Sequence, residues 1–84
     1  MDKRIVIFDD NIKRRESLEM LIDLSDDMIC VGSFPDCSNV LNNIDKSEPD
    51  LVLMDIDMPN VNGIEGVTII RTKYPHLKIL MQTV

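Results

Sequence analysis

The most informative stretch of this sequence is LVLMDIDMP, residues 51–59. Its first four residues are all apolar, which is typical of a strand buried on both faces of a parallel sheet. This apolar run ends at Asp55, so a carboxylate directly follows the buried strand. The same pattern occurs in IVIFDD, residues 5–10, where another apolar run ends at Asp9 and Asp10. Two buried strands that each end in carboxylates predict an α/β fold with a polar site at one end of its sheet.

Four strands are predicted in all, at residues 5–8, 28–31, 51–54 and 78–82. The segments between them place apolar residues at helical spacing, which predicts helices over about 11–25, 37–46 and 64–74. Asp36 is a possible N-cap of the second helix. Pro75 ends the third, because the residue before a proline avoids helical backbone. Strands that alternate with helices, without hairpin turns, predict a parallel sheet with helices on both faces.

The residues at the ends of the predicted strands indicate the strand order. Three strands end in side chains that can bind a ligand, namely Asp9 and Asp10, Asp55 and Asp57, and Thr83. The second strand ends instead at Val31 and Gly32. Ligands of open parallel sheets bind beyond the carboxyl ends of the strands, where the strand order reverses. We therefore expect the second strand at an edge and the first and third strands side by side, in the order 2-1-3-4.

Carboxylates that gather in one crevice repel one another and raise one another's proton affinity unless a cation is bound. Mg²⁺ suits such a site because it prefers oxygen ligands and is held by one or two carboxylates together with a phosphate. The sequence has no cluster of His or Cys that would favour zinc. A carboxylate beside the ion can attack phosphorus and form an aspartyl phosphate, to which the Thr83 hydroxyl can donate a hydrogen bond.

Four motifs carry a family resemblance: IVIFDD (5–10), LVLMDIDMP (51–59), Gly63 and ILMQT (79–83). In this order and spacing, they resemble the receiver domain of bacterial two-component response regulators, over all 84 residues. The resemblance implies a flavodoxin-like fold. It also implies a cytoplasmic signalling domain that a sensor histidine kinase or a small phosphodonor phosphorylates. Phosphorylation would switch its contacts with a downstream output domain or protein, and the domain would catalyse at most its own phosphorylation and dephosphorylation.

The resemblance further implies a role for each site residue. Asp55 would be the phosphoacceptor. Asp10 would ligate Mg²⁺ directly and Asp9 would assist, often through water. Asp55 itself and the backbone carbonyl of Asp57 would be the other protein ligands. Thr83 would be the switch hydroxyl, which moves toward the phosphoryl group.

The family pattern continues beyond the point where this chain ends, into a helix, a fifth strand that carries a lysine, and a closing helix. We therefore expect residues 1–84 to be a receiver domain that is truncated after its fourth strand. In such a fragment the fourth strand is an unprotected edge that carries Ile79, Leu80 and Met81, which favours pairing with a second copy. Self-association through this strand is a hypothesis that light scattering can test.

The composition argues against several other classes of protein. Nine Lys and Arg against fifteen Asp and Glu give a net charge of −6, which disfavours contact with nucleic acid or with anionic membranes. Apolar runs of only four residues, such as residues 5–8, are too short to span a membrane. Cys30 and Cys37 form no C-x-x-C pair, so reduced thiols in the cytoplasm are expected. Arg14 and Arg15 are interpreted as part of a solvated helix face.

Other functions fit some of the same residues. Asp55 and Asp57, placed after an apolar strand, also resemble the nucleophile and acid of haloacid-dehalogenase-type phosphatases. That family, however, favours Thr or Val where Pro59 stands and has no acidic pair upstream. A receiver-like interaction module that is never phosphorylated is a further alternative. The segment Asp9-Asp10-Asn11 also fits a plain helix N-cap, because Asp and Asn are preferred at that position.

Overall fold

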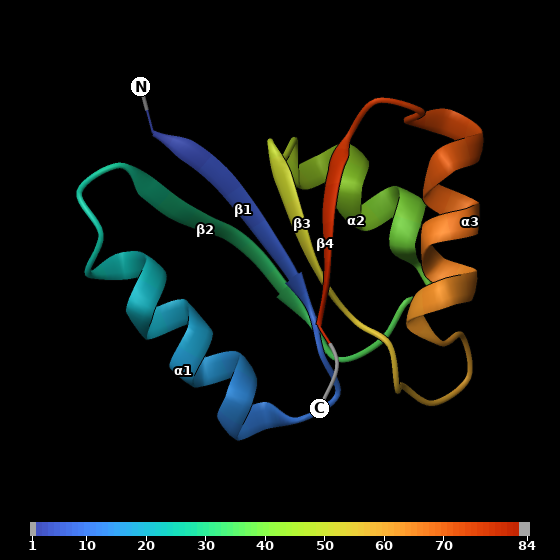
Figure 1. Cartoon of the computed structure of the whole chain (residues 1–84), viewed down its shortest axis with the longest axis horizontal. Coiled ribbons are helices and arrows are strands. Elements are labelled where there is room, and N and C mark those ends of the chain that lie inside the picture. Colours follow the sequence, from blue (N-terminus) through green and yellow to red (C-terminus); the bar gives the residue numbers. More distant parts are fainter. Residues whose placement is uncertain (1, 83–84) are drawn as a thin grey trace.

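The computed structural model of this chain describes residues 2–82, which form a parallel sheet and the helices that cover it. The elements are β1 (Lys3–Phe8), α1 (Ile12–Asp23), β2 (Met28–Phe34), α2 (Val40–Ser47), β3 (Leu51–Asp55), α3 (Gly63–Lys73) and β4 (Lys78–Gln82). Figure 1 shows the sheet, whose paired strands are parallel and lie in the order β2-β1-β3-β4. The predicted α/β fold and the predicted order 2-1-3-4 are confirmed.

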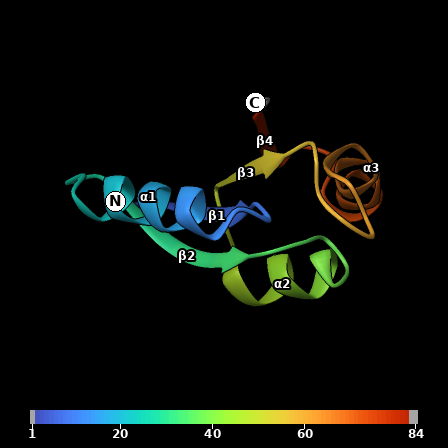
Figure 2. The same ribbon diagram turned by 90° about the horizontal axis from the view of Figure 1, so that it is seen from below.

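Helices cover both faces of the sheet, with α1 on one face and α2 and α3 on the other (Figure 2). Ile5 and Ile7 of β1 pack against Ile22 of α1. Val6 and Phe8 point the other way and pack with buried side chains of α2 and α3. Because successive side chains of a strand point to opposite faces, a strand covered on both faces needs an unbroken apolar run. This requirement explains the composition of residues 5–8.

β2 is longer than the sequence predicts. It continues through Gly32 to Phe34, and its register against β1 shifts so that Val31 is an extra residue on β2. At its end the ring of Phe34 stacks on that of Phe8, with the two centroids 5.4 Å apart. The predicted end of this strand at Val31 and Gly32 was wrong, because pairing with β1 continues past the glycine. The predicted position of the strand at a sheet edge is confirmed.

Side chains cap the first turns of α1 and α3. The amide oxygen of Asn11 accepts a hydrogen bond from the backbone N–H of Arg14 at 3.0 Å, and that of Asn62 accepts one from Glu65 at 2.9 Å. Each bond pairs a backbone N–H that has no partner within its helix. In the described part of the chain, no helix has the length and apolar character of a membrane span.

The predicted N-cap of α2 was wrong. This helix begins at Val40, and its N-cap is Asn39, whose side chain makes no capping hydrogen bond. Asp36 instead accepts hydrogen bonds from the backbone N–H and the hydroxyl of Ser38, at 3.0 and 2.6 Å. A short polar side chain that binds the backbone two residues further on stabilises a turn, and this turn precedes the helix.

An acidic site at the carboxyl ends of two strands

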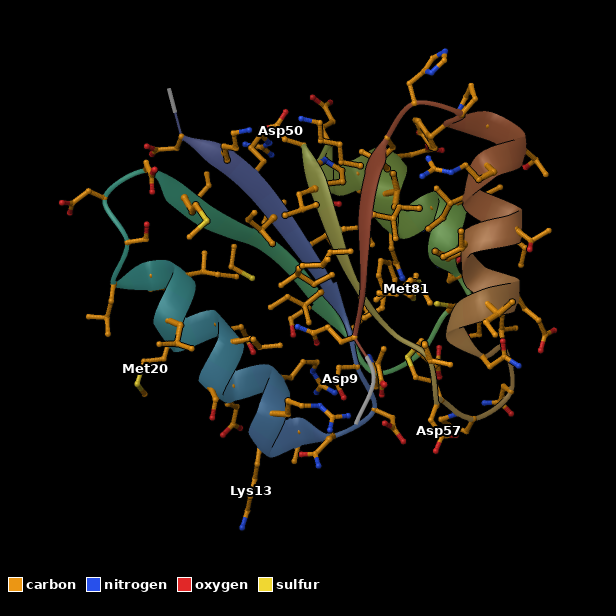
Figure 3. The ribbon with its side chains drawn as sticks, in the orientation of Figure 1. Asp9, Lys13, Met20, Asp50, Asp57 and Met81 are labelled. Carbon is orange, nitrogen blue, oxygen red and sulfur yellow. The ribbon has the colours of Figure 1, made fainter. Side chains whose placement is uncertain are left out.

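β1 and β3 bring two carboxylates together at the same end of the sheet. The strands are parallel neighbours, with Phe8 opposite Met54. Asp9 and Asp55 each come one residue after this pair, so they lie next to each other. Both are buried, with side chains that are 0% and 2% exposed. Figure 3 shows Asp9 at this end of the sheet, and Asp50 at the opposite end.

Asp9, Asp10 and Asp55 form what we call the acidic site. Each offers a carboxylate oxygen, and these three oxygens lie within 4.8 Å of one another. Asp10 is exposed to solvent, so the site opens to water on its side. A set of hard oxygen atoms this close together fits Mg²⁺, which binds oxygen ligands in preference to nitrogen or sulfur. The structure therefore brings together the three side chains that the sequence grouped at strand ends, while their roles stay predictions.

The guanidinium of Arg14 bridges the two buried carboxylates. Its Nε and Nη2 atoms donate to the two carboxylate oxygens of Asp9, at 2.5 and 2.9 Å. Nη2 also donates to Oδ2 of Asp55 at 3.1 Å. The sequence interpretation of Arg14 as part of a solvated face was wrong, because its side chain is only 34% exposed and is bound to both acids.

Sequence reasoning missed Arg14 because helical spacing shows only which face of a helix is apolar. It does not show where the first turn lies relative to the strand that precedes it. The available signal was proximity along the chain, since three basic residues, Lys13, Arg14 and Arg15, follow Asp9 and Asp10 at the start of the predicted helix. The neighbouring Arg15 also points inward, and its Nη1 donates to the backbone carbonyl of Asp9 at 2.8 Å.

The surroundings of Asp9 hold its pKa below the ordinary value. Burial alone raises the pKa of this carboxyl, but hydrogen bonds from the Arg14 side chain and the Asn11 backbone N–H more than offset the burial. The charges of Arg14 and Arg15 act in the same direction. Asp9 is therefore an ionised carboxylate that is already paired.

Asp55 differs from Asp9 because its pKa is raised. Burial is the largest cause, and the charge of Asp9 and the nearby Asp10 add to it. The hydrogen bond from the backbone N–H of Asp57 and the charge of Arg14 offset these effects only in part. Asp55 is consequently the more basic of the two buried acids.

Asp57 lies outside the acidic site, on the loop that follows β3 (Figure 3). Its side chain is exposed, and its backbone N–H donates to Oδ1 of Asp55 at 3.3 Å. The predicted role of its carbonyl as a metal ligand stays a prediction. Thr83, the predicted switch hydroxyl, lies outside the described residues.

The loop between β3 and α3 folds tightly back on Asp55. The backbone N–H of Gly63 donates to the carbonyl of Ile56 at 2.9 Å. A Cβ atom at Gly63 would collide with the backbone carbonyl of Asp55. Only glycine therefore fits the first position of α3 in this arrangement. The family motif residue Gly63 thus has a steric function beside the candidate phosphoacceptor.

Residues 5–84 match the family described as the response regulator receiver domain. The chain therefore belongs to the receiver domain family of two-component response regulators, whose general property is phosphorylation on an aspartate. This assignment agrees with the fold and with an acidic site at the ends of β1 and β3.

Individual relatives point to the same class of domain. The transcriptional regulatory protein DegU of Brevibacillus brevis is 33% identical over 81 residues, which are 96% of this chain and 34% of that protein. A protein-glutamate methylesterase/protein-glutamine glutaminase of Thermotoga maritima is 35% identical over 80 residues, which are 95% of this chain and 23% of that protein. This chain thus spans between about a quarter and a third of the length of these two relatives.

Solved structures support the fold assignment. The crystal structure of the response regulator domain of Thermotoga maritima CheB superposes with a TM-score of 0.91 and is 34% identical to this chain. The match covers 99% of this chain and 61% of that one. The receiver fold predicted from the sequence motifs is confirmed.

Proposed function

We propose that this chain is a phosphoacceptor signalling domain and that Asp55 receives the phosphoryl group. The observation that supports this role is the position of Asp55 at the end of β3, where its buried carboxylate adjoins Asp9 and Asp10. Its raised pKa makes it the more basic of the buried acids. A basic carboxylate among other carboxylates is suited to attack a phosphoryl group that arrives with a cation.

In the proposed reaction, a carboxylate oxygen of Asp55 attacks the phosphorus of an anionic donor. The P–N bond of a phosphohistidine, or the P–O bond of a small acyl phosphate, breaks as the new O–P bond forms. The electron pair of the broken bond stays with the leaving nitrogen or oxygen, and Asp55 becomes an aspartyl phosphate. The backbone N–H of Asp57 holds Oδ1 of Asp55 during this step, through the hydrogen bond described above.

Asp9, Asp10 and Asp55, together with the backbone carbonyl of Asp57, would hold Mg²⁺. When bound, this ion supplies positive charge against the phosphoryl oxygens. The carboxylates of the chain hold the ion close to Asp55, and Asp10, as the exposed member of the site, provides the open side from which a donor approaches.

The partners that we propose follow from membership of the family. A sensor histidine kinase donates the phosphoryl group, and a downstream output domain or protein responds to the changed contacts. The domain itself catalyses at most its own phosphorylation and dephosphorylation, and it acts in the cytoplasm. Thr83 is proposed to bind the phosphoryl group through its hydroxyl. Because the net charge is −6, we expect no direct contact between this segment and nucleic acid.

The proposed reaction is tested by intact mass after incubation with acetyl phosphate and Mg²⁺. We expect a mass increase of one phosphoryl group on the parent chain and none on Asp55→Asn. Asp57→Asn is the matched control, because Asp57 also loses one charge but contributes only backbone groups to the site. This control should keep the adduct.

Other outcomes distinguish the alternatives. Release of phosphate with continuous turnover and no lasting adduct would support a phosphatase. A folded parent chain that forms no adduct would support an interaction module that is not phosphorylated. An adduct that persists in Asp55→Asn would place the reaction on another side chain and contradict the proposal.

A further inference from the structure

The guanidinium of Arg14 contacts two of the three carboxylates of the acidic site, those of Asp9 and Asp55. We propose that Arg14 is a built-in counter-ion of the acidic site, which competes with Mg²⁺ for the carboxylates of Asp9 and Asp55 and so lowers the affinity of the site for the ion. The inference deepens the proposed function, on which it rests for the identity of the ion.

Shared ligand atoms are the first argument for competition. Nε and Nη2 of Arg14 together engage both carboxylate oxygens of Asp9 and one oxygen of Asp55, at 2.5 to 3.1 Å. Mg²⁺ requires its oxygen ligands at about 2.1 Å in near-octahedral geometry. Each of these three oxygens directs at least one lone pair at an N–H group of Arg14, and Oδ1 of Asp9 uses both of its lone pairs, because it also accepts from the backbone N–H of Asn11. An ion that binds here therefore competes with Arg14 for oxygens that are already hydrogen-bonded to it.

Charge is the second argument. Three carboxylates carry a formal charge of −3, and one guanidinium reduces it to −2. Without Arg14, the two buried acids would repel each other with only the charge of Arg15 among the described residues to offset it at Asp9, which is a costly arrangement in the metal-free chain. A divalent ion therefore binds to a site whose negative charge Arg14 already reduces, and the guanidinium of Arg14 also repels it. Both effects weaken its binding.

The start of α1 holds Arg14 in this position. Asn11 links the two partners, because its backbone N–H donates to Oδ1 of Asp9 at 2.8 Å and its side chain accepts from the backbone N–H of Arg14 at 3.0 Å. The next residue, Arg15, binds the backbone carbonyl of Asp9 at 2.8 Å. The first turn of α1 is thus fixed to the end of β1 at several points, and the guanidinium is preorganised over the acids.

The test is calorimetric titration of Mg²⁺ into the folded chain, together with thermal unfolding in EDTA and in Mg²⁺. We expect Arg14→Gln to bind Mg²⁺ about tenfold more tightly, because removal of a charged hydrogen-bonding partner is worth that much. In EDTA the same variant should melt below the parent, and Mg²⁺ should raise its melting temperature by more than it raises that of the parent.

Lys13→Gln is the matched control. It removes the same charge one residue away, from an exposed side chain that points away from Asp9 (Figure 3). Its affinity for Mg²⁺ should stay close to that of the parent. Arg14→Lys keeps the positive charge but loses the planar guanidinium, which donates to two oxygens at once. Its affinity for Mg²⁺ should therefore fall between those of the parent and Arg14→Gln. This second variant also replaces Arg14→Gln as the test if the latter does not fold.

Two results would overturn the inference. Equal tightening in Lys13→Gln and Arg14→Gln would assign the effect to overall charge. Unchanged Mg²⁺ affinity in both Arg14 variants, with a lower melting temperature in EDTA and in Mg²⁺ alike, would assign a purely structural role to Arg14. Neither measurement depends on phosphorylation of Asp55. The mass experiment can therefore contradict the proposed function while the Mg²⁺ titration supports this inference. The titration can equally contradict this inference while the mass experiment supports the proposed function.

Discussion

Cys37 is a thiol that the fold protects from solvent. It is 1% exposed, and its Sγ lies 3.4 Å from Sδ of Met54. The helix α3 approaches so closely that a Cβ at Gly66 would lie 2.7 Å from the same sulfur. Burial, with a smaller contribution from the charge of Asp36, raises the pKa of Cys37 from 9.0 to about 12. The folded chain therefore keeps this thiol protonated at alkaline pH.

This shift predicts how stability depends on alkaline pH. Between about pH 9 and about pH 12 the unfolded chain loses the Cys37 proton while the folded chain keeps it, so the stabilisation is complete below pH 9 and is lost as the pH rises. The parent should lose about 1.4 kcal/mol per pH unit in this range beyond what Cys37→Ala loses. Urea unfolding at about pH 8 and about pH 10.5 measures the difference.

Cys30→Ala serves as the control for this measurement. Cys30 is partly exposed, and its removal leaves Cys37 in place, so the steep loss above pH 9 should persist. Parallel stability curves for the parent and Cys37→Ala would contradict the assignment of the loss to this buried thiol.

Single residues also show how much of the acidic site the sequence could predict. Asp9, Asp10 and Asp55 were predictable because each follows an apolar run, and neighbouring parallel strands bring their ends together. Arg14 was not predictable in this way. Its contact with Asp55 joins residues 41 positions apart, and depends on where the first turn of α1 lies over the strand ends.

At the scale of elements, the limits of sequence prediction follow from pairing and local turns. The type and order of the strands and helices agree with the sequence, because unbroken apolar runs and helical spacing are strong signals. The ends of β2 and α2 do not agree. β2 extends to Phe34 because its partner β1 continues, and α2 begins at Val40 because Asp36 binds Ser38 in a turn. Neither effect is visible in a local pattern.

The helix caps differ in a way that unfolding measurements can detect. The side chain of Asn62 accepts a hydrogen bond from the N–H of Glu65, whereas the side chain of Asn39 makes no such bond. Asn62→Ala should therefore cost about 1 kcal/mol in the free energy of unfolding, and Asn39→Ala only a few tenths. Urea unfolding of both variants measures this. Equal losses would show that the capping bond contributes little to α3.

At the scale of the whole molecule, one face of the sheet is covered unevenly. On this face α1 packs against β1 and β2. β4 forms an edge of the described sheet, and its Leu80 is 55% exposed. Ile79 and Met81 point to the opposite face, where they pack against the core that α2 and α3 cover. An exposed edge strand with an exposed leucine is a surface on which a second strand can pair.

Self-association through β4 therefore stays a prediction, with a second copy of this chain as the partner. Light scattering over a dilution series should show a mass above the monomer that falls on dilution, and Leu80→Lys should reduce it because a charge at the edge opposes pairing. Leu24→Lys is the control, since Leu24 is 76% exposed and lies beyond the end of α1, away from β4. Monomer at every concentration would reject the prediction.

The contact between Gly63 and the backbone of Asp55 has a mechanical consequence. Where side chains separate two segments, a change of rotamer can absorb a small displacement of one segment before the other moves. Here the backbone of Gly63, at the start of α3, packs directly against the backbone of Asp55, at the end of β3. We therefore expect a displacement of the Asp55 main chain to move the first turn of α3 with it, because no side chain lies between them.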